Sequence, residues 1–270
     1  MTFSIVGRSD TGDAWGVAVA SKFLAVGSAV PAGAAGAGAL ATQAMANLSY
    51  RGAGLALLAQ GRPAEQVVAA LTEADAERAH RQLGVVDARG GSAGYTGASC
   101  FPWAGHRVGA GYACQGNILT GPQVLEAVER TWLDGAGLAL PHRLLAALQA
   151  GDAAGGDRRG RQSAALLVLR AGAGYGGLSD VEMDLRVDDH PDPCAELGRL
   201  VDLHDLYFGT PEEASLLELE GELADEVRER LARLGYATLQ DWAGVENYEM
   251  RMVPGRIDPL VLGKLREATS

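Results

Sequence analysis

This sequence of 270 residues is poor in cysteine, aromatic residues and positive charge. Its three cysteines, Cys100, Cys114 and Cys194, form neither a paired metal-ligand spacing nor a dense disulfide pattern. We therefore expect reduced thiols, no metal site and a cytoplasmic location. The formal net charge of −11 argues against a general surface for nucleic acid or for anionic membranes. These absences favour a small molecule as the partner.

Long apolar runs are also missing. Residues 24–41 are uncharged and rich in Gly and Ala, but Pro31 interrupts them and they lack the leucine density of a membrane span. They follow a strand-like hairpin and not a short basic leader, so we expect no signal peptide. A phosphate-binding loop and a dinucleotide fingerprint are both absent, and we expect no cofactor.

Thr2 is the most informative residue that is present. A small hydroxyl residue after the initiator methionine favours removal of Met1, which would leave a threonine with a free α-amine at the start of an apolar strand, residues 2–6. Such a residue carries its own nucleophile and base, because the hydroxyl attacks and an amine with a pKa of roughly 7.7–8.0 accepts the proton. The alternative is that Thr2 is an ordinary strand residue.

Lys22 is one of only two lysines in a chain with 23 basic residues. A lysine in the apolar stretch 17–23 suggests a need for a compact ammonium. If residues 2–6 and 16–20 pair as an antiparallel hairpin, Ser21 and Lys22 return to the vicinity of Thr2. There Lys22 would stabilise the developing alkoxide and Ser21 would orient the amine. The alternatives are a lysine that reaches into water and an exposed hydroxyl.

Several segments in order resemble domain-of-unknown-function family 1028. They are residues 2–6, 16–23, 41–47, 80–87, 115–117, 157–166 and 186–191. That family is grouped with the N-terminal-nucleophile hydrolases. The resemblance therefore implies an α/β fold, a four-layer αββα sandwich with two antiparallel sheets between helical layers. It implies a class of chemistry but no substrate.

Hydrophobic patterning and turn residues predict blocks of strands and helices. We expect strands over residues 2–6, 16–20, 38–42, 83–87, 93–96, 107–115, 163–169 and 181–187. We expect helices over residues 48–60, 63–73, 122–133, 141–150 and 193–208. Groups of strands separated by pairs of helices suit a layered sandwich better than alternating βαβ units.

A domain boundary is expected near Gly209, which can end one helix, and Thr210, which can cap the next with Pro211 and Glu213. The predicted domains are an N-terminal-nucleophile-hydrolase-like domain, 1–209, and a small all-helical domain, 210–270. The second domain is similar, at residues 231–236, 247–249 and 257–259, to the peptidoglycan-binding-like module appended to some members of the family. Without a secretion signal, we favour a packing or oligomer-contact role, and we expect a homodimer or a higher homo-oligomer.

A loop rich in arginine supplies candidate substrate ligands. The planar guanidinium groups of Arg158, Arg159 and Arg161 suit a substrate carboxylate. The alternative is an exposed loop in which these arginines pair with Asp152 and Asp157.

Side-chain amides supply the remaining candidates. Gln115, Gly116 and Asn117 are interpreted as a transition from strand to helix, where amides and free backbone N–H groups can stabilise an oxyanion. Their alternative role is turn and capping chemistry. Gln43 and Asn47 are expected either to face the substrate cavity or to bond the backbone.

Two other clusters offer competing chemistry. The acidic residues and the single histidine of segment 188–192 suit a divalent cation, but the same acids more simply supply the N-terminus of a helix. Cys100 and His106 would form a thiol–imidazole pair, yet free cysteine is usually a small buried apolar residue.

The sequence therefore predicts an amidohydrolase that cleaves a C–N bond of a small molecule, with Thr2, Lys22, Ser21 and Asn117 as its catalytic residues. The alternative is a non-catalytic small-molecule-binding protein on the same scaffold, because a fold does not establish a function. A retained Met1 would favour this alternative by blocking the α-amine.

Overall fold

The computed structural model describes residues 2–270, so the predicted removal of Met1 concerns a residue outside the described part. The chain divides into two compact units, Met1–Arg199 and Leu200–Ser270, and each is described by itself. Between residues 2 and 270, no helix combines the length and the apolar character needed to cross a bilayer.

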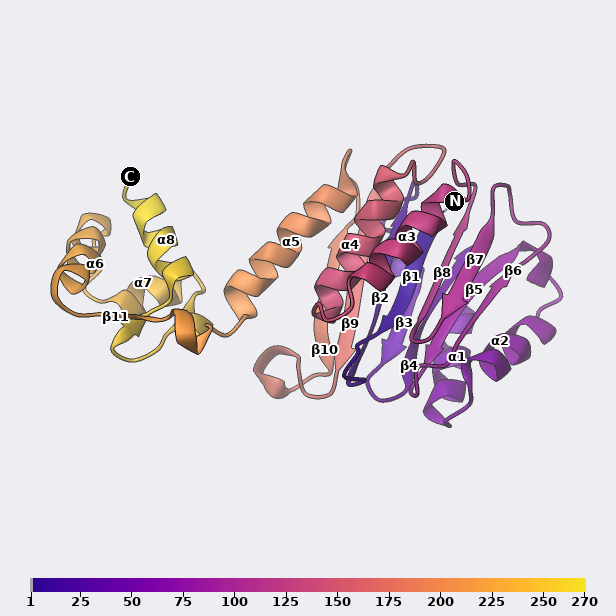
Figure 1. Cartoon of the computed structure of the whole chain (residues 1–270), viewed down its shortest axis with the longest axis horizontal. Helices are drawn as coiled ribbons and strands as arrows, with labels where there is room; N and C mark the ends of the chain where they lie inside the picture. The colour runs from indigo at the N-terminus through magenta and orange to yellow at the C-terminus, as the bar shows by residue number, and fades with distance from the viewer. Residues whose placement is uncertain (1) are drawn as a thin grey trace. The chain divides into compact units, whose positions relative to one another are not determined.

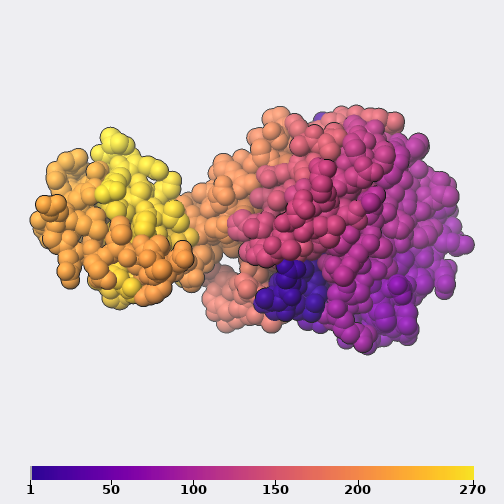
Figure 2. All heavy atoms as spheres, in the orientation of Figure 1, coloured from indigo at the N-terminus to yellow at the C-terminus, as the bar shows by residue number. Residues whose placement is uncertain are grey.

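The N-terminal unit contains a six-stranded antiparallel sheet with the order β10-β9-β2-β1-β8-β7. Its strands are β1 (Thr2–Arg8), β2 (Ala14–Ser21), β7 (Gly105–Gly109), β8 (Tyr112–Asn117), β9 (Ser163–Arg170) and β10 (Val181–Val187). The strand β1 lies between β2 and β8, so the N-terminal segment lies in the interior of the sheet. Figure 2 shows the indigo N-terminal segment as one compact patch of atoms on this face.

A second, four-stranded antiparallel sheet has the order β3-β4-β5-β6. Its strands are β3 (Pro31–Ala34), β4 (Gly38–Ala44), β5 (Arg81–Asp87) and β6 (Ser92–Thr96). The two sheets pack face to face around a buried cluster that includes Val6 and Val17 from the first sheet and Ala41 and Val86 from the second (Figure 1).

Helices cover the outer faces of both sheets (Figure 1). The helices α1 (Ser49–Ala59) and α2 (Ala64–Glu73) pack on the four-stranded sheet, where Leu58 and Leu71 meet Leu40. The helices α3 (Gln123–Asp134) and α4 (Leu140–Ala153) pack on the six-stranded sheet. Side chains alternate along β1, so one set faces these helices and the other set faces the second sheet. The expected mixed α/β fold with antiparallel sheets is confirmed.

Two features of this unit differ from the sequence-based expectations. The expected strand over residues 107–115 is the hairpin of β7 and β8, which turns at Gly111, where φ is +77°. The strand β3 was not expected, because its four residues are mostly Ala and Gly and lack the β-branched side chains that mark a strand. The helix α5 (Pro193–Phe208) matches its predicted range.

The C-terminal unit is mainly helical, with α6 (Gly221–Leu234), α7 (Leu239–Val245) and α8 (Pro259–Ala268) around a buried cluster that includes Trp242 and Tyr248. The expectation of an all-helical domain is wrong in one detail. The short strands β11 (Leu217–Glu218) and β12 (Arg256–Ile257) pair with each other, and the first long helix, α6, starts only at Gly221. Thr210 begins no helix, since residues Glu213–Ser215 form only a 3-10 turn.

Candidate functional site

Thr2 begins β1 and is 5% exposed. Its Oγ1 lies 3.1 Å from Ser21 Oγ at the end of β2. Its carbonyl oxygen accepts hydrogen bonds from Gln43 Nε2 at 3.1 Å and from Asn117 Nδ2 at 3.5 Å. Thr2 and Asn117 are partners in the β1–β8 register, and Gln43 reaches across from β4 of the second sheet. The structure therefore brings four of the predicted site residues together at one end of the two sheets.

Gln82 on β5 links these residues, and the sequence interpretation did not single it out. Its Oε1 accepts hydrogen bonds from Gln43 Nε2 at 2.8 Å and from Asn117 Nδ2 at 3.0 Å. Its Nε2 lies 2.8 Å from the Gly116 carbonyl and 3.0 Å from Thr96 Oγ1. The available sequence signal was a glutamine directly before the apolar run 83–86, and its complete burial explains why it needs hydrogen-bond partners.

Gln115, Gly116 and Asn117 lie within β8 and not at a transition from strand to helix, which corrects that interpretation. Gly116 is paired with Phe3 of β1 on one side and with Gly105 of β7 on the other, so its backbone lies in the interior of the sheet. The physical reason is that β8 pairs with β1 over residues 112–117 and with β7 over residues 112–116, so this segment is sheet and has no helix-terminal N–H groups for an oxyanion. Of the three residues, only the Asn117 side chain contacts Thr2.

Gln115 belongs to the same buried layer. Its Nε2 donates to Ser4 Oγ at 2.6 Å, and Ser4 Oγ donates to Gln43 Oε1 at 2.6 Å. Its Oε1 has no hydrogen-bond partner in the described structure and points at Gly84 of β5, where a Cβ atom would clash with it. Gln115 therefore joins the two sheets behind Thr2 and does not reach a substrate directly.

Lys22 follows Ser21, and its side chain is exposed. Its backbone N–H donates to Asp157 Oδ2 at 2.8 Å, and its Nζ donates to the Arg161 carbonyl at 3.2 Å. The ammonium is thus directed to the arginine-rich loop. Asp157, with a buried carboxylate, is a residue that the sequence interpretation named only as a partner of arginine, and it also fixes the backbone next to Ser21.

The three arginines have different surroundings. Arg159 Nη2 lies 3.4 Å from Asp157 Oδ2, and Arg161 makes a two-pronged pair with Asp152 in which both contacts are 2.9 Å. Hydrogen bonding to Asp152 raises the pKa of Arg161. These two arginines match the alternative of a self-paired loop. Arg158 is exposed, and its backbone N–H donates to the Ile118 carbonyl at 3.2 Å, next to Asn117.

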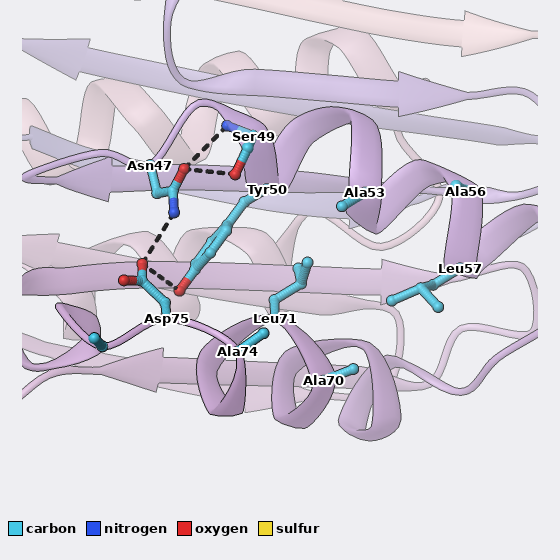
Figure 3. A pocket seen from close by; sticks show the side chains of 11 residues that line it. Asn47, Ser49, Tyr50, Ala53, Ala56, Leu57, Ala70, Leu71, Ala74 and Asp75 are labelled. Carbon is cyan, nitrogen blue, oxygen red and sulfur yellow. Dashed lines mark hydrogen bonds between the residues drawn. The ribbon is translucent and has the colours of Figure 1, made fainter.

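Asn47 lies in a groove between α1 and α2 and has no described contact with Thr2. Figure 3 shows its Nδ2 donating to Asp75 Oδ2 at 3.0 Å, next to the Tyr50 hydroxyl, which donates to the same oxygen at 2.9 Å. Arg81 Nε adds a third hydrogen bond at 2.9 Å and is the main cause that lowers the pKa of Asp75. The groove has a volume of about 510 Å³ and is lined mostly by Ala and Leu side chains.

Cys100 and His106 line a second cavity of about 480 Å³. The thiol donates to the Arg81 carbonyl at 3.3 Å, and burial raises its pKa. The imidazole Nδ1 lies 2.9 Å from Thr96 Oγ1, and burial lowers the pKa of His106. A raised thiol pKa disfavours a nucleophilic thiolate. Over residues 2–270, no group of three or more His, Cys, Asp and Glu side chains is placed to hold a metal ion.

Comparisons with known proteins agree with this division of the chain. A family model described as a family of unknown function, DUF1028, matches residues 2–197. A model described as "Putative peptidoglycan binding domain" matches residues 207–265. The chain is similar to the crystal structure of protein SPO2555 from Silicibacter pomeroyi, a DUF1028 protein, with a TM-score of 0.68, 31% identity and coverage of 83% of this chain and 92% of that chain. None of the curated proteins matches the chain.

Proposed function

Because this chain belongs to the DUF1028 family, whose function is unknown, we propose its activity from the site itself: it is an amidohydrolase with an N-terminal threonine nucleophile. In this proposal, removal of Met1 frees the α-amine of Thr2. The four layers of helix, sheet, sheet and helix support an N-terminal-nucleophile-hydrolase-like fold for residues 1–209, the first of two proposed domains.

The observation that carries the proposal is the pair of hydroxyls at the start of β1, with Thr2 Oγ1 3.1 Å from Ser21 Oγ. A free α-amine on Thr2 would lie on the same residue as the nucleophile and would need no distant base. Ser21 then holds the threonine hydroxyl in one orientation. A buried setting strengthens each of these interactions, because the local dielectric constant is low.

The proposed reaction has two steps. Thr2 Oγ1 attacks the carbonyl carbon of a small amide, and the α-amine takes the hydroxyl proton and passes it to the leaving nitrogen as the C–N bond breaks. Water then hydrolyses the acyl ester and releases the acid. The proposed donor to the oxyanion is the Asn117 amide, which would exchange its long hydrogen bond of 3.5 Å to the Thr2 carbonyl for one to the oxyanion. The exposed residues Lys22, next to Ser21, and Arg158, bonded to the residue after Asn117, supply positive charge near Thr2. Arg158 is the proposed partner of a substrate carboxylate.

The test compares the protein purified from its host, with its intact mass measured, against two variants. Thr2→Ala should abolish turnover of small amides such as acyl p-nitroanilides, because the nucleophile is removed. Thr11→Ala, which changes an exposed threonine in the turn after β1, should keep the full rate. A Thr2→Ala variant with undiminished activity, or a native protein that retains Met1, would refute the mechanism.

A binding protein on the same scaffold is the second candidate. It is favoured by one observation, the 5% exposure of Thr2, whose neighbouring amides are already bonded to one another. Tight binding of an amide without turnover by the processed protein would support this candidate.

For the C-terminal unit, the match of residues 207–265 to a peptidoglycan-binding family supports a role in binding a glycan–peptide polymer. We propose this role in preference to the packing or oligomer-contact role that the sequence favoured, which stays a prediction. The cytoplasmic location and the homo-oligomer remain predictions, which cell fractionation and light scattering would test.

A further inference from the structure

Two exposed apolar side chains follow residues that are hydrogen-bonded to Thr2, and a third lies on a segment that is hydrogen-bonded to the residue after Asn117. Phe23 comes two residues after Ser21 and is 54% exposed, and Met45 comes two residues after Gln43 and is 59% exposed. Phe101 is 67% exposed. We call Phe23, Met45 and Phe101 the apolar collar.

Hydrogen bonds link the chain next to each collar residue to Thr2 or to the residue after Asn117. Ser21 Oγ lies 3.1 Å from Thr2 Oγ1, and Gln43 Nε2 lies 3.1 Å from the Thr2 carbonyl oxygen. The Phe101 carbonyl accepts a hydrogen bond of 2.9 Å from the N–H of Ile118, which directly follows Asn117. The three segments come from β2, β4 and the connection between β6 and β7, so they approach Thr2 from both sheets.

Exposure of large apolar side chains is unfavourable in water, and exposed apolar surface bordered by polar residues marks a binding site more often than chance. Here Lys22 directly precedes Phe23, and its exposed side chain supplies polar surface next to that collar residue. In the proposed reaction the acyl part of the substrate stays bonded to Thr2 Oγ1 while the amine leaves. The groups next to Thr2 are therefore best placed to hold the acyl part.

We propose that the apolar collar receives the acyl chain of the amide bound at Thr2, so that the substrates are amides of medium-length aliphatic acids. This inference rests on the proposed function, because it assigns the ligand of the same site. Each methylene that the collar covers should improve recognition by up to about fourfold, and by about twofold where it is half covered.

The experiment has a binding arm and a turnover arm. In the binding arm, titration calorimetry of the full-length Thr2→Ala variant uses acetamide, butyramide, hexanamide and octanamide, and the dissociation constant should fall about twofold to fourfold per methylene. In the turnover arm, kcat/KM of the processed protein on the matching acyl p-nitroanilides should rise by the same factor. Phe23→Ser, Met45→Ser and Phe101→Ser should each flatten both trends. Leu178→Ser, which changes a side chain 93% exposed between β9 and β10, should leave them unchanged.

The two arms separate the two ideas. If turnover occurs and neither turnover nor binding depends on chain length, the collar does not bind the acyl chain, and the proposed amidohydrolase activity is unaffected. Chain-length-dependent binding that the collar variants abolish, without any turnover, would support the collar as an acyl site and refute the hydrolase. If the collar variants instead convert an oligomer into a monomer and leave the chain-length trend intact, the collar is a contact between copies and the inference is wrong.

Discussion

At the scale of single residues, Gln82 is the side chain that holds the polar layer behind Thr2 together. Its carboxamide meets donors from Gln43 and Asn117 and acceptors that include Thr96 Oγ1. A buried polar group that loses its partner costs about 1–3 kcal/mol. We expect Gln82→Ala to lower the free energy of unfolding by about 2–4 kcal/mol, since it leaves several groups unpaired.

Urea unfolding followed by circular dichroism measures this loss. The matched control is Gln66→Ala on the exposed face of α2, which should change stability by less than about 0.5 kcal/mol. Equal stability of the two variants would show that the buried layer contributes nothing.

His106 gives a pH dependence of known sign. Gln82 Nε2 is a donor only, so Thr96 Oγ1 accepts from it and has its own proton free for His106 Nδ1. We expect the neutral imidazole to carry its proton on Nε2 in this arrangement, and desolvation lowers the pKa of His106 below its usual 6.5. The unfolded chain binds more protons in this range. The stability from neutral His106 is complete above pH 6.5 and is lost as the pH falls below that value.

Nuclear magnetic resonance titration of the His106 ring should show this lowered midpoint and the Nε2–H tautomer. Unfolding of a His106→Gln variant should depend less on pH just below 6.5 than unfolding of the unchanged protein. A midpoint above 6.5 would contradict the lowered pKa of His106.

Sequence reasoning identified the residues at the strand ends better than their partners. The hairpin argument brought Ser21 back to Thr2, because antiparallel pairing with a short turn fixes which residues meet. It could not give the direction of the Lys22 ammonium, since a long side chain beyond a strand end takes its partner from the tertiary fold. Gln82 and Asp157 come from distant segments, and single-sequence patterns do not show which distant polar residues become buried together.

At the scale of elements, most helices and strands of the N-terminal unit followed from hydrophobic patterning and turn residues. The errors arose where hydrogen-bond pairing with a distant strand decides the structure and not the local residue pattern. The segment before α6 forms β11 because β12 supplies its hydrogen bonds, and no pattern within residues 210–220 indicates that distant partner. The start of α8 was predictable, because Asp258 caps it and Pro259 occupies its first turn.

Arg251 ties α5 to α8 within the C-terminal unit. Its Nη1 lies 2.6 Å from Asp258 Oδ2, its Nε donates to the Leu206 carbonyl at 2.6 Å, and its Nη2 donates to the Asp205 carbonyl. Both charged side chains are buried. Removal of one partner leaves a buried charge, so we expect Arg251→Met to destabilise this unit by about 3–5 kcal/mol.

Hydrogen exchange of peptides from α6 and α8 measures this effect. Arg233→Met, which removes an exposed pair with Glu229 on α6, should change exchange by less than about 0.5 kcal/mol. Arg251→Met peptides that exchange as slowly as the unchanged protein would contradict the assigned role.

At the scale of the whole molecule, the two units carry separate cores. The cluster around Trp242 draws its members from residues 203–265, and the clusters of the two sheets draw theirs from residues 6–165. A chain built in this way can place catalysis in one unit and attachment to a polymer in the other. The net charge of −11 also argues against attachment through simple attraction to an anionic surface.

Sedimentation with insoluble peptidoglycan tests whether the C-terminal unit attaches the chain to this polymer independently of Thr2. We expect the full chain and its Thr2→Ala variant to pellet equally with the polymer, because Thr2 lies outside the matched residues 207–265. Arg251→Met should reduce pelleting at least about tenfold if it unfolds the unit that binds, since a loss of 1.4 kcal/mol of binding already gives that factor. Cellulose serves as the control polymer and should pellet none of the three proteins. A full chain that stays in solution with peptidoglycan would return the C-terminal unit to the packing or oligomer-contact role, because its buried cluster would then serve the architecture of the chain and not a ligand.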